Sequence, residues 1–554
     1  MSKILIVGGV AVGATAAARL SRLNNNDEII IFERGKHVSF ANCGLPYYIG
    51  DIIKEREVLL LQTPQKFNKR YGVQVRINSE VINIDSLKKE IEIVDTTSGY
   101  RYSESYDYLI LAPGANPIHP EIKGLSNAKN VYFLRNINDV DSLFNQCQIS
   151  NKQNALVIGG GFIGVEVAEN LLERGFSVTL VNKSKHILAP FDEEMSVMIE
   201  NILIEKGINI INNTSVNAFL EEGKLVILDN GNNLHVDFSV LSIGVSPEIK
   251  LAQKAGLQIG VTGGIKTNEF LQTSNPSIYA GGDAAEIKSL ITGEPVRIPL
   301  AGPANRQAVI IADNIHGRNK KYFGSIGSSV LKIFEYTAAS TGLNADQLRG
   351  SNMNFEEIHI TRSNHASYYP NSSDVTLKVL FNPDTGKILG AQAIGKEGTE
   401  KRIDVIATAI KAGFIVQDLT ELELTYAPPY SSAKDPVNIA GYVAMNTIEG
   451  IHKTFKVQDV ESLVNSGIKI VDVRTPEEYK LGNIPGSINI PIDDIQTRKT
   501  QIPNEDILYV VCQVGLRGYL AQQFLKQSCP NITVYNLSGG YKLYEEYIRQ
   551  NKKV

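Results

Sequence analysis

The sequence predicts a multidomain α/β protein in which one structural design occurs twice before the pattern changes. Three observations predict it. An apolar strand, a glycine-rich turn and an Ala-rich helix follow one another over residues 3–23, and the same succession returns over 154–173. After residue 454, short apolar strands alternate with helix starts, as in parallel-sheet units. A length of 554 residues suits three or four domains.

The composition is that of an ordinary globular chain, 43% hydrophobic and 21% charged, with a formal net charge of −4. We therefore expect no general attraction to nucleic acid or to an anionic membrane. The N-terminus runs into a strand without a signal-peptide pattern, and no apolar run is long enough to span a bilayer. Cys43, Cys147, Cys512 and Cys529 lack C-x-x-C and metal-ligand spacing. We expect reduced thiols, no disulfide framework, no metal site and a cytoplasmic location.

The first glycine-rich turn holds Gly8, Gly9 and Gly13, and the next strand, EIIIFE, ends at Glu33. In Rossmann-like dinucleotide-binding units such a turn lies at a helix N-terminus, beneath the pyrophosphate, and the carboxylate binds the adenosine ribose. Val10 occupies the usual place of the second glycine. Taken alone, this turn leaves a plain glycine-rich turn equally open.

The second turn has a complete G-x-G-x-x-G pattern at Gly159, Gly161 and Gly164. Two units of this design predict two bound dinucleotides, FAD and a nicotinamide cofactor. The strand after the second turn ends in Val-Asn182-Lys183, where an NADH-selective site usually carries an acid. Without that acid a 2′-phosphate is not repelled, and Lys183 attracts one. We predict that NADPH is accepted, alone or beside NADH; a loop that merely varies is the alternative.

Three further segments complete the pattern. Residues 106–115 and 238–247 are each predicted to be a buried strand that runs into a glycine turn. Residues 273–283, TSNPSIYAGGD, place Asp283 after a strand and two glycines. At these residues the chain resembles the flavin-dependent pyridine nucleotide–disulfide oxidoreductases. The resemblance implies that Asp283 binds the ribityl chain of FAD.

Cys43 lies in SFANCGLPYYIG, residues 39–50. Dithiol members of the family carry a second cysteine five residues later, where this chain has Tyr48. Members that reduce peroxide or oxygen carry a His in the first glycine-rich turn, where this chain has Ala11. The second hypothesis is an NAD(P)H oxidase or peroxidase that works through a Cys43 sulfenic acid, and Ala11 argues against it. A sulfur-binding or sensing module is the third, and the flavin and nicotinamide motifs argue against it.

Residues 39–50, 364–370 and 425–438 resemble the coenzyme A disulfide reductase branch. That resemblance implies a homodimer in which Cys43 forms a mixed disulfide with coenzyme A, while Tyr368 and Tyr426 of the partner subunit hydrogen-bond its sulfur. Tyrosines that only pack in an interface are the alternative. The coenzyme A site of the branch resembles Thr15, Arg19, Arg22, Ser39, Asn42, Asn305 and Lys434 here. Of these, the two arginines lie three residues apart on one predicted helix, which suits phosphate binding.

The C-terminal part, residues 455–554, resembles a single rhodanese domain. The motifs DVRTPEEY and IPGSINIP carry the resemblance, with the six-residue loop from Cys512 to Arg517. Backbone N–H groups at a helix N-terminus and the charge of Arg517 are expected to stabilise a thiolate or persulfide on Cys512. Asn483 stands where many relatives have His. No motif surrounds Cys147 or Cys529, and packing explains both.

The resemblance divides the chain into four domains: an FAD-binding domain (1–120 and 250–325), an NAD(P)H-binding domain (121–249), an α+β dimerisation domain (326–450) and the α/β rhodanese domain (455–554). It implies an NAD(P)H-dependent reductase of coenzyme A disulfide, coenzyme A persulfide or polysulfide. Cys43 would act in series with Cys512, with a pantetheine arm carrying sulfur between them. Coenzyme A disulfide and persulfide present the same kind of sulfur–sulfur bond, so both substrates and both directions of sulfur flow stay open.

Overall fold

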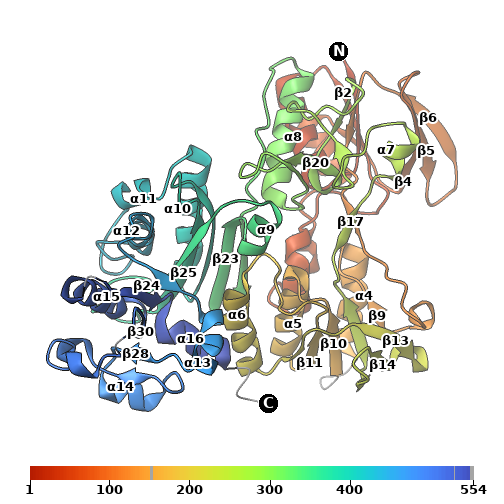
Figure 1. Cartoon of the computed structure of the whole chain (residues 1–554). Helices are drawn as coiled ribbons and strands as arrows, with labels where there is room; N and C mark the ends of the chain where they lie inside the picture. The colour runs from red at the N-terminus through yellow and green to blue at the C-terminus, as the bar shows by residue number, and fades with distance from the viewer. Residues whose placement is uncertain (150–153, 504, 530, 550–554) are drawn as a thin grey trace. The chain divides into compact units, whose positions relative to one another are not determined.

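The chain, seen in a computed structural model (Figure 1), is described over residues 1–149, 154–503, 505–529 and 531–549. It divides into two compact units. Unit 1 comprises Met1–Lys185 and Ile208–Gly327, and unit 2 comprises His186–Gly207 and Ser328–Val554. Among the helices of the described residues, none combines the length and apolar character that a membrane crossing requires.

Unit 1 begins with a parallel five-stranded sheet. Its strands are, in spatial order, β19 (Ile278–Ala280), β7 (Tyr108–Leu111), β1 (Lys3–Val7), β2 (Glu28–Phe32) and β3 (Gln74–Arg76). Ile4 and Ile6 pack against helices α1 (Ala11–Leu23) and α8 (Ala301–Ile315). Leu5 points to the opposite face, because successive strand residues alternate. β1, β2, β7 and β19 are mainly apolar, in keeping with burial of both faces of the sheet.

The opposite face of this sheet is covered by an antiparallel meander. Its strands are β4 (Ser79–Asp85), β5 (Glu90–Asp95) and β6 (Arg101–Ser105). Ile84 and Ile93 of the meander share a buried cluster with Leu5 and Leu109 of the parallel sheet. Helices therefore cover one face of the sheet and a meander covers the other. This packing holds β1, the strand that precedes the first glycine-rich turn.

The second half of unit 1 repeats the design. Its parallel sheet consists of β12 (Asn209–Ile211), β11 (Ser177–Val181), β10 (Asn154–Ile158), β16 (Phe238–Leu241) and β9 (Val131–Tyr132). Helices α4 (Ile137–Gln148) and α5 (Phe162–Glu173) belong to it. Leu156 and Ile158 pack against a second meander, built from β13 (Val216–Leu220), β14 (Leu225–Leu228) and β15 (Asn233–His235).

Shorter elements complete unit 1. Among the described residues they are α2 (Leu45–Ile49), α3 (Pro64–Tyr71), α7 (Lys250–Lys254), β8 (Ala115–Pro117), β17 (Val245–Pro247), β18 (Ile265–Lys266), β20 (Ala285–Lys288) and β21 (Pro295–Val296). β8 pairs with β17 in antiparallel register. The buried strands predicted within residues 106–115 and 238–247 are confirmed as β7 and β16.

Unit 2 contains an antiparallel five-stranded sheet. In spatial order its strands are β22 (Ser329–Ile333), β23 (Tyr336–Gly342), β26 (Ile388–Gly395), β25 (Asp374–Phe381) and β24 (Glu356–Ser363). Leu377 and Val379 pack on one face against helices α10 (Thr399–Ala412) and α12 (Pro436–Ile448). The segment TLKVLFNPDTGKILGAQAIG, residues 376–395, supplies most of β25 and all of β26, and α10 follows it. Short helices α9 (Ala345–Gly350) and α11 (Asp418–Glu421) complete this part.

Lys378 lies between these apolar residues and points to the other face of the sheet. Its ammonium is 2.8 Å from Asp192, 2.6 Å from Glu194 and 3.2 Å from Glu357, and its side chain is 1% exposed. Asp192 and Glu194 come from the start of helix α6 (Glu193–Lys206). Burial opposes the charge on Glu194, but Lys378 and His359 hold the pKa of this carboxyl well below its usual range. The cluster stays charged because each member is compensated.

The last part of unit 2 is a parallel five-stranded sheet with helices on both faces. Its strands are β27 (Thr454–Phe455), β31 (Thr533–Leu537), β30 (Ile507–Val511), β28 (Ile470–Asp472) and β29 (Ile488–Asn489). Its helices are α13 (Val460–Asn465), α14 (Pro476–Leu481), α15 (Leu516–Ser528) and α16 (Gly540–Ile548). His359 of β24 bonds the hydroxyl of Ser538 at 2.9 Å, which joins this sheet to the antiparallel one.

Candidate active sites

Cys43 lies in a short 3₁₀ turn, Asn42–Gly44, directly before helix α2. The residue is exposed. The backbone N–H of Ser39 donates to the carbonyl of Gly9 at 2.8 Å, and Ser39 itself has a φ of 49°. This contact ties the cysteine segment to the first glycine-rich turn. The structure therefore brings Ser39, Asn42 and Cys43 beside the turn that the sequence predicts to bind a dinucleotide.

The surroundings of Cys43 disfavour its thiolate. Desolvation of the sulfur by the protein around it raises the pKa of the Cys43 thiol, and the negative charges of Glu166 and Asp283 raise it further. Arg135 opposes them. A thiol in this setting is a weak nucleophile unless a positive charge or a hydrogen-bond donor is brought to its sulfur.

Sequence reasoning missed two residues near Cys43. The hydroxyl of Tyr47, on α2, donates to the Glu166 carboxylate on α5 at 3.4 Å. Burial raises the pKa of Glu166 to about 7, and burial with the Glu166 charge raises that of Tyr47 to about 12. The one signal in the sequence is an acidic residue two positions after Gly164, within an apolar helix.

The first glycine-rich turn fits a dinucleotide. Gly8 has a φ of +95°, and a Cβ there would lie 2.1 Å from the carbonyl oxygen of Ala112. A Cβ on Gly13 would lie 1.8 Å from the carbonyl oxygen of Gly8, so neither residue admits a side chain. Glu33 follows β2 and accepts from the N–H of Gly9 at 2.9 Å. A carboxylate thus stands beside a tight turn at the start of α1, the arrangement that holds a ribose and a pyrophosphate.

Asp283 lies in a 3₁₀ turn, Gly282–Ala284, just after β19. Its side chain is 25% exposed, and its Oδ2 is 3.7 Å from Nη2 of Arg135. Burial raises the pKa of Asp283, while Arg135 and Arg297 lower it. A partly accessible carboxyl at the C-terminal end of β19 fits a polyol such as the ribityl chain, which hydrogen-bonds carboxylates.

The second glycine-rich turn has the same construction. Gly159 has a φ of +110°, and a Cβ on Gly164 would lie 1.9 Å from the carbonyl oxygen of Gly159. A Cβ on Gly161 would meet nothing within 4 Å, so this glycine faces open space in which phosphates fit. The buried Asn182 donates to the carbonyl of Ser184 at 3.0 Å and shapes the loop after β11. Lys183 is exposed.

The predicted coenzyme A residues are only partly brought together. Thr15 donates to the side-chain oxygen of Asn305 at 2.6 Å. Arg19 pairs with Asp313 at 2.8 Å, so its charge is already compensated, whereas Arg22 is exposed. The buried Oδ1 of Asn42 has no hydrogen-bond partner within the described part of the chain. Lys434 belongs to unit 2, where its ammonium lies 5.5 Å from the ring centroid of Tyr442.

Tyr368 and Tyr426 also belong to unit 2, and the structure brings their hydroxyls to 3.1 Å from each other. Both side chains reach solvent, at 75% and 47% exposure. Beneath them the buried Arg402 donates to the carbonyl of Asn364 at 2.6 Å and to Asp435 at 2.9 Å. One guanidinium thereby joins the two loops that carry the tyrosines.

Cys512 follows β30 and is buried, 1% exposed. The N–H of Gly515 donates to its sulfur at 3.1 Å. The N–H of Tyr541 at the start of α16 donates to the carbonyl of Cys512 at 2.8 Å. Gly540 has a φ of +67°, and a Cβ there would lie 2.6 Å from the same carbonyl. The loop is thus held at its Cys512 end, and the N–H of Gly515 is directed at the sulfur.

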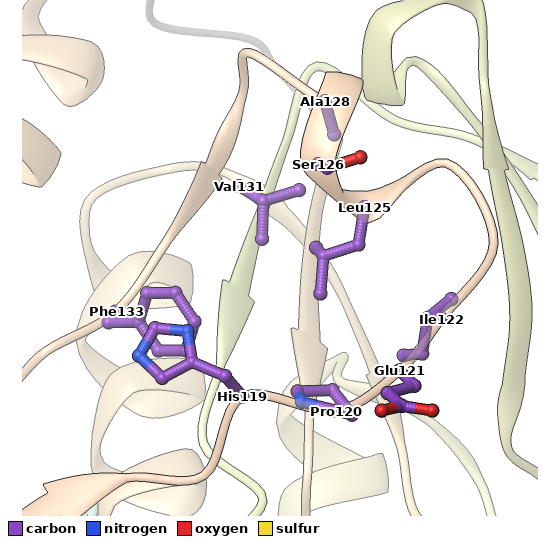
Figure 2. A pocket seen from close by; sticks show the side chains of 9 residues that line it. All are labelled: His119, Pro120, Glu121, Ile122, Leu125, Ser126, Ala128, Val131 and Phe133. Atoms are coloured by element: carbon purple, nitrogen blue, oxygen red, sulfur yellow. The ribbon is translucent and has the colours of Figure 1, made fainter.

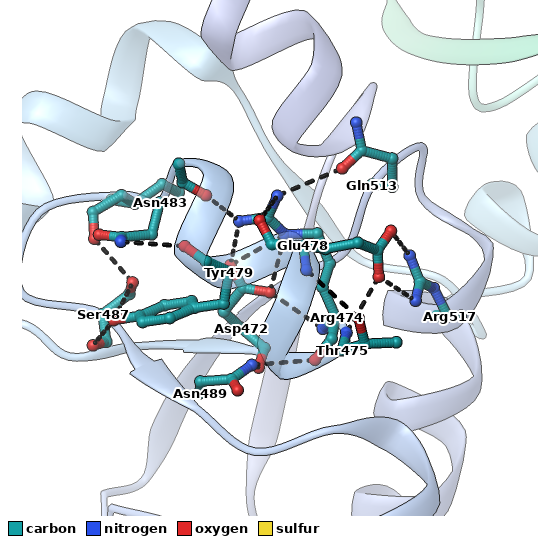
Figure 3. A network of polar contacts seen from close by, with 12 residues as sticks. Asp472, Arg474, Thr475, Glu478, Tyr479, Asn483, Ser487, Asn489, Gln513 and Arg517 are labelled. Atoms are coloured by element: carbon teal, nitrogen blue, oxygen red, sulfur yellow. Dashed lines mark hydrogen bonds and ion pairs between the residues drawn. The ribbon is translucent and has the colours of Figure 1, made fainter.

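Arg517 differs from the sequence-based expectation. Helix α15 begins at Leu516, so Arg517 lies in its first turn, and its guanidinium forms two bonds of 2.6 Å with Glu478 (Figure 3). These bonds hold the pKa of Glu478 at about 2. Part of the charge that Arg517 was expected to give the sulfur is therefore compensated by Glu478, which sequence reasoning did not identify. DVRTPEEY contains this glutamate, so the signal was present in the motif.

The other two cysteines lie apart from these sites. Cys147 is buried in α4, and burial raises its pKa to about 11, in keeping with a packing role. Cys529 is partly exposed at the end of α15. All four cysteines are free thiols in the described residues. A hollow of about 470 Å³ near His119 and Phe133 (Figure 2) is lined by none of the predicted site residues.

Comparison with known families assigns most of the chain. Residues 2–308 match the pyridine nucleotide-disulphide oxidoreductase family. The chain belongs to this family. Residues 328–436 match its dimerisation domain, and residues 456–547 match the rhodanese-like domain. The resemblance inferred from the sequence and the predicted fold class are confirmed.

Individual relatives narrow the branch. Coenzyme A disulfide reductase of Staphylococcus aureus (strain JH9) is 36% identical over 446 residues, which cover 80% of this chain and 100% of that protein. Reduced Bacillus anthracis CoADR-RHD is 47% identical with a TM-score of 0.97, covering 99% of this chain and 98% of that one. A NAD-dependent persulfide reductase from A. fulgidus is 35% identical with a TM-score of 0.92, covering 98% and 99%. The chain is a pyridine nucleotide–disulphide oxidoreductase with a rhodanese domain, similar to coenzyme A disulfide reductases.

Proposed function

We propose that this protein is an FAD-dependent NAD(P)H reductase of coenzyme A disulfide and coenzyme A persulfide or polysulfide, with a rhodanese domain that handles sulfane sulfur on Cys512. The observation that carries the proposal is the single exposed cysteine, Cys43, beside the first glycine-rich turn. Tyr48, five residues on, is buried and stacked on Phe144 with 4.5 Å between ring centroids. The cysteine must therefore pair with a sulfur that the substrate brings.

The two dinucleotides have defined places in this proposal. FAD would be held by Gly8, Gly9, Gly13, Glu33 and Asp283. NAD(P)H would be held by Gly159, Gly161, Gly164, Asn182 and Lys183. When bound at these residues, the two cofactors would supply the redox chemistry: a hydride from NAD(P)H and an electron pair for the sulfur site. The exposed Lys183 supports use of NADPH, and the A. fulgidus relative is described as NAD-dependent.

Cys43 acts by thiol–disulfide exchange. Its thiolate attacks one sulfur of coenzyme A disulfide, a Cys43–coenzyme A disulfide forms, and one coenzyme A leaves as thiolate. Two electrons then cleave the mixed disulfide and release the second coenzyme A. With a persulfide substrate the corresponding leaving group is hydrosulfide. Each leaving thiolate takes up one proton.

The groups that assist this exchange follow from the electrostatics. Tyr368 and Tyr426 of the partner subunit would donate to the sulfur and so offset the raised pKa of Cys43. Glu166, whose pKa burial raises to about 7, accepts a hydrogen bond from Tyr47 and would exchange a proton near the sulfur at neutral pH. Both roles suit a reaction that produces thiolates.

Coenzyme A would be recognised by Thr15, Arg19, Arg22, Ser39, Asn42, Asn305 and Lys434. The buried Oδ1 of Asn42 supports this, because a buried acceptor without a partner is costly and a ligand N–H would satisfy it.

We also propose the division into domains 1–120 with 250–325, 121–249, 326–450 and 455–554. We further propose a homodimer through the dimerisation domain, and a reducing, cytoplasmic setting for the free thiols.

Mass spectrometry of the intact protein tests the proposal. The NADPH-reduced holoenzyme is treated anaerobically with coenzyme A disulfide, and the adduct is mapped. We expect one coenzyme A per subunit on Cys43 and none in Cys43→Ser. Labelling of Cys147 or Cys529 instead would contradict the proposal.

A further inference from the structure

The loop around Cys512 contains little free positive charge. Between Cys512 and Arg517 stand only Gln, Val, Gly and Leu. Arg517 is the one cation of the loop, and both its terminal nitrogens bond Glu478 at 2.6 Å (Figure 3). An arginine held in this fork by a carboxylate presents little net charge to a second anion.

Basic side chains of the surrounding elements are also engaged. The backbone N–H of Lys542 donates to the carbonyl of Gln513 at 3.0 Å, and its ammonium pairs with Asp374. Arg474 is 2% exposed and donates to Asp472 at 2.7 Å and to the side chain of Gln513 at 3.2 Å (Figure 3). Burial lowers the pKa of His452 to about 4, so this ring is neutral at pH 7. The sulfur is left with the N–H of Gly515, at 3.1 Å, and the positive end of helix α15.

That environment suits a single negative charge on the Cys512 sulfur. It also suits a sulfur donor whose remaining part, the thiol carrier, is uncharged. A backbone N–H and a helix N-terminus stabilise a single thiolate or persulfide. A small donor that brings two charges, such as thiosulfate, needs a cation close to the loop. The start of α15 carries two exposed apolar side chains instead: Leu516 and Leu520 are 48% and 49% exposed and lie four residues apart on one face of the helix.

We propose that the Glu478–Arg517 pair and the leucines make Cys512 selective for sulfane sulfur carried on a long uncharged thiol arm, such as pantetheine, and exclude thiosulfate. The inference rests on the proposed function and specifies the donor for the Cys512 site. In the step, the Cys512 thiolate attacks the terminal sulfur of R–S–S⁻. The carrier's S–S bond breaks as the Cys512 S–S bond forms, and R–S⁻ leaves and takes up a proton. No electrons are gained or lost overall.

The test measures persulfide formation on Cys512 in the full-length holoenzyme, by mass spectrometry, with coenzyme A persulfide and with thiosulfate as donors. We expect the kcat/KM for thiosulfate to be at least about 100-fold lower than that for coenzyme A persulfide. Glu478→Gln frees Arg517 and keeps a hydrogen-bonding side chain at the N-terminus of α14, where Gln replaces Glu in capping boxes. It should raise the thiosulfate-to-persulfide ratio of kcat/KM about tenfold or more.

Two further variants make the test decisive. Leu516→Lys adds a cation at an exposed loop position without touching the ion pair, and should raise the same ratio. Glu477→Gln removes the same charge one residue away, at an exposed position, and should leave the ratio unchanged. Comparable use of both donors by the wild type, or an unchanged ratio in both Glu478→Gln and Leu516→Lys, would overturn the inference.

A parallel assay separates this inference from the proposed function. Reduction of coenzyme A disulfide through Cys43 is measured in the same preparations. Normal reductase activity together with rapid loading of Cys512 from thiosulfate would disprove only the proposed donor selectivity. Absence of reductase activity would remove the proposed function. Absence of loading from either donor would remove both the selectivity and the sulfur-handling role of Cys512.

Discussion

The hydroxyl groups of Tyr368 and Tyr426 lie 3.1 Å apart, although they come from different loops. The hydrogen bond to Tyr426 raises the pKa of Tyr368. Of the two hydroxyl protons, one is engaged between the phenols and the other is free for a hydrogen bond to a third group. The buried Arg402 holds the two loops together. The pair is therefore a preformed donor for a sulfur leaving group.

Tyr426→Phe and Tyr368→Phe should each lower the kcat for coenzyme A disulfide about 10- to 100-fold, because each removes a donor to the leaving thiolate. The double variant should lose less than the product of the two effects, since the hydroxyls act as one unit. Steady-state kinetics checks this, with Tyr430→Phe, at an exposed position nearby, as the control. Equal, multiplicative losses would indicate independent roles.

Glu166→Gln should make Cys43 more reactive. Removing a negative charge near the thiol favours its thiolate, so the pH midpoint of Cys43 alkylation should fall. Alkylation rates of the reduced holoenzyme with iodoacetamide, between about pH 6 and pH 10, measure the midpoint. Glu173→Gln, exposed on the same helix, should leave it unchanged. An unchanged midpoint in Glu166→Gln would show that desolvation alone sets the reactivity of Cys43.

Lys183→Ala should lower the kcat/KM for NADPH about tenfold while changing that for NADH less than about twofold, because only the 2′-phosphate needs the cation. Initial rates with each coenzyme at matched ionic strength measure the difference. Lys224→Ala removes an exposed charge from the same part of unit 1 and serves as the control. A loss shared equally by both coenzymes would contradict a 2′-phosphate contact.

The rhodanese domain should lose stability on acidification. Burial lowers the pKa of His452 to about 4, whereas in the unfolded chain it is about 6.5. The unfolded state thus gains a proton first as the pH falls, and about 3 kcal/mol of stability is lost between those two values. Protonation would also break the bond that Asn536 donates to His452 Nε2 at 3.1 Å.

Hydrogen exchange of peptides from β30 and β31, corrected for the intrinsic rate, checks this loss. His452→Gln should flatten the pH dependence, and the exposed His119→Gln should leave it as in the wild type. A wild-type slope in His452→Gln would assign the acid sensitivity to other groups.

Structural features that depend on neighbouring residues in the chain were predictable from the sequence. The two glycine-rich turns, the strand before Asp283 and the loop after β30 each depend on local spacing, and the structure contains them. Close backbone packing at Gly8, Gly13, Gly159 and Gly164 admits no side chain, so glycine is required there and its spacing is visible in the sequence. Such constraints act over a few neighbouring residues, and the sequence alone therefore predicts them.

Features that join distant residues were not predictable. Lys378 sits in an alternating strand pattern, and nothing local indicates that Asp192, Glu194 and Glu357 surround its ammonium. The pairing of Arg517 with Glu478 changes the role expected of that arginine, although both belong to recognisable motifs. Charge compensation depends on which side chains meet in space, and sequence spacing carries that information only within an element.

Anaerobic NADPH oxidation with coenzyme A disulfide, coenzyme A persulfide and polysulfide tests the central claim most directly, with wild type, Cys43→Ser and Cys512→Ser compared. We predict that Cys43→Ser abolishes turnover of all three substrates, because the reductive step needs the Cys43 mixed disulfide. Cys512→Ser should keep turnover of both coenzyme A substrates and lose that of polysulfide. Turnover of coenzyme A disulfide that survives in Cys43→Ser would contradict the account.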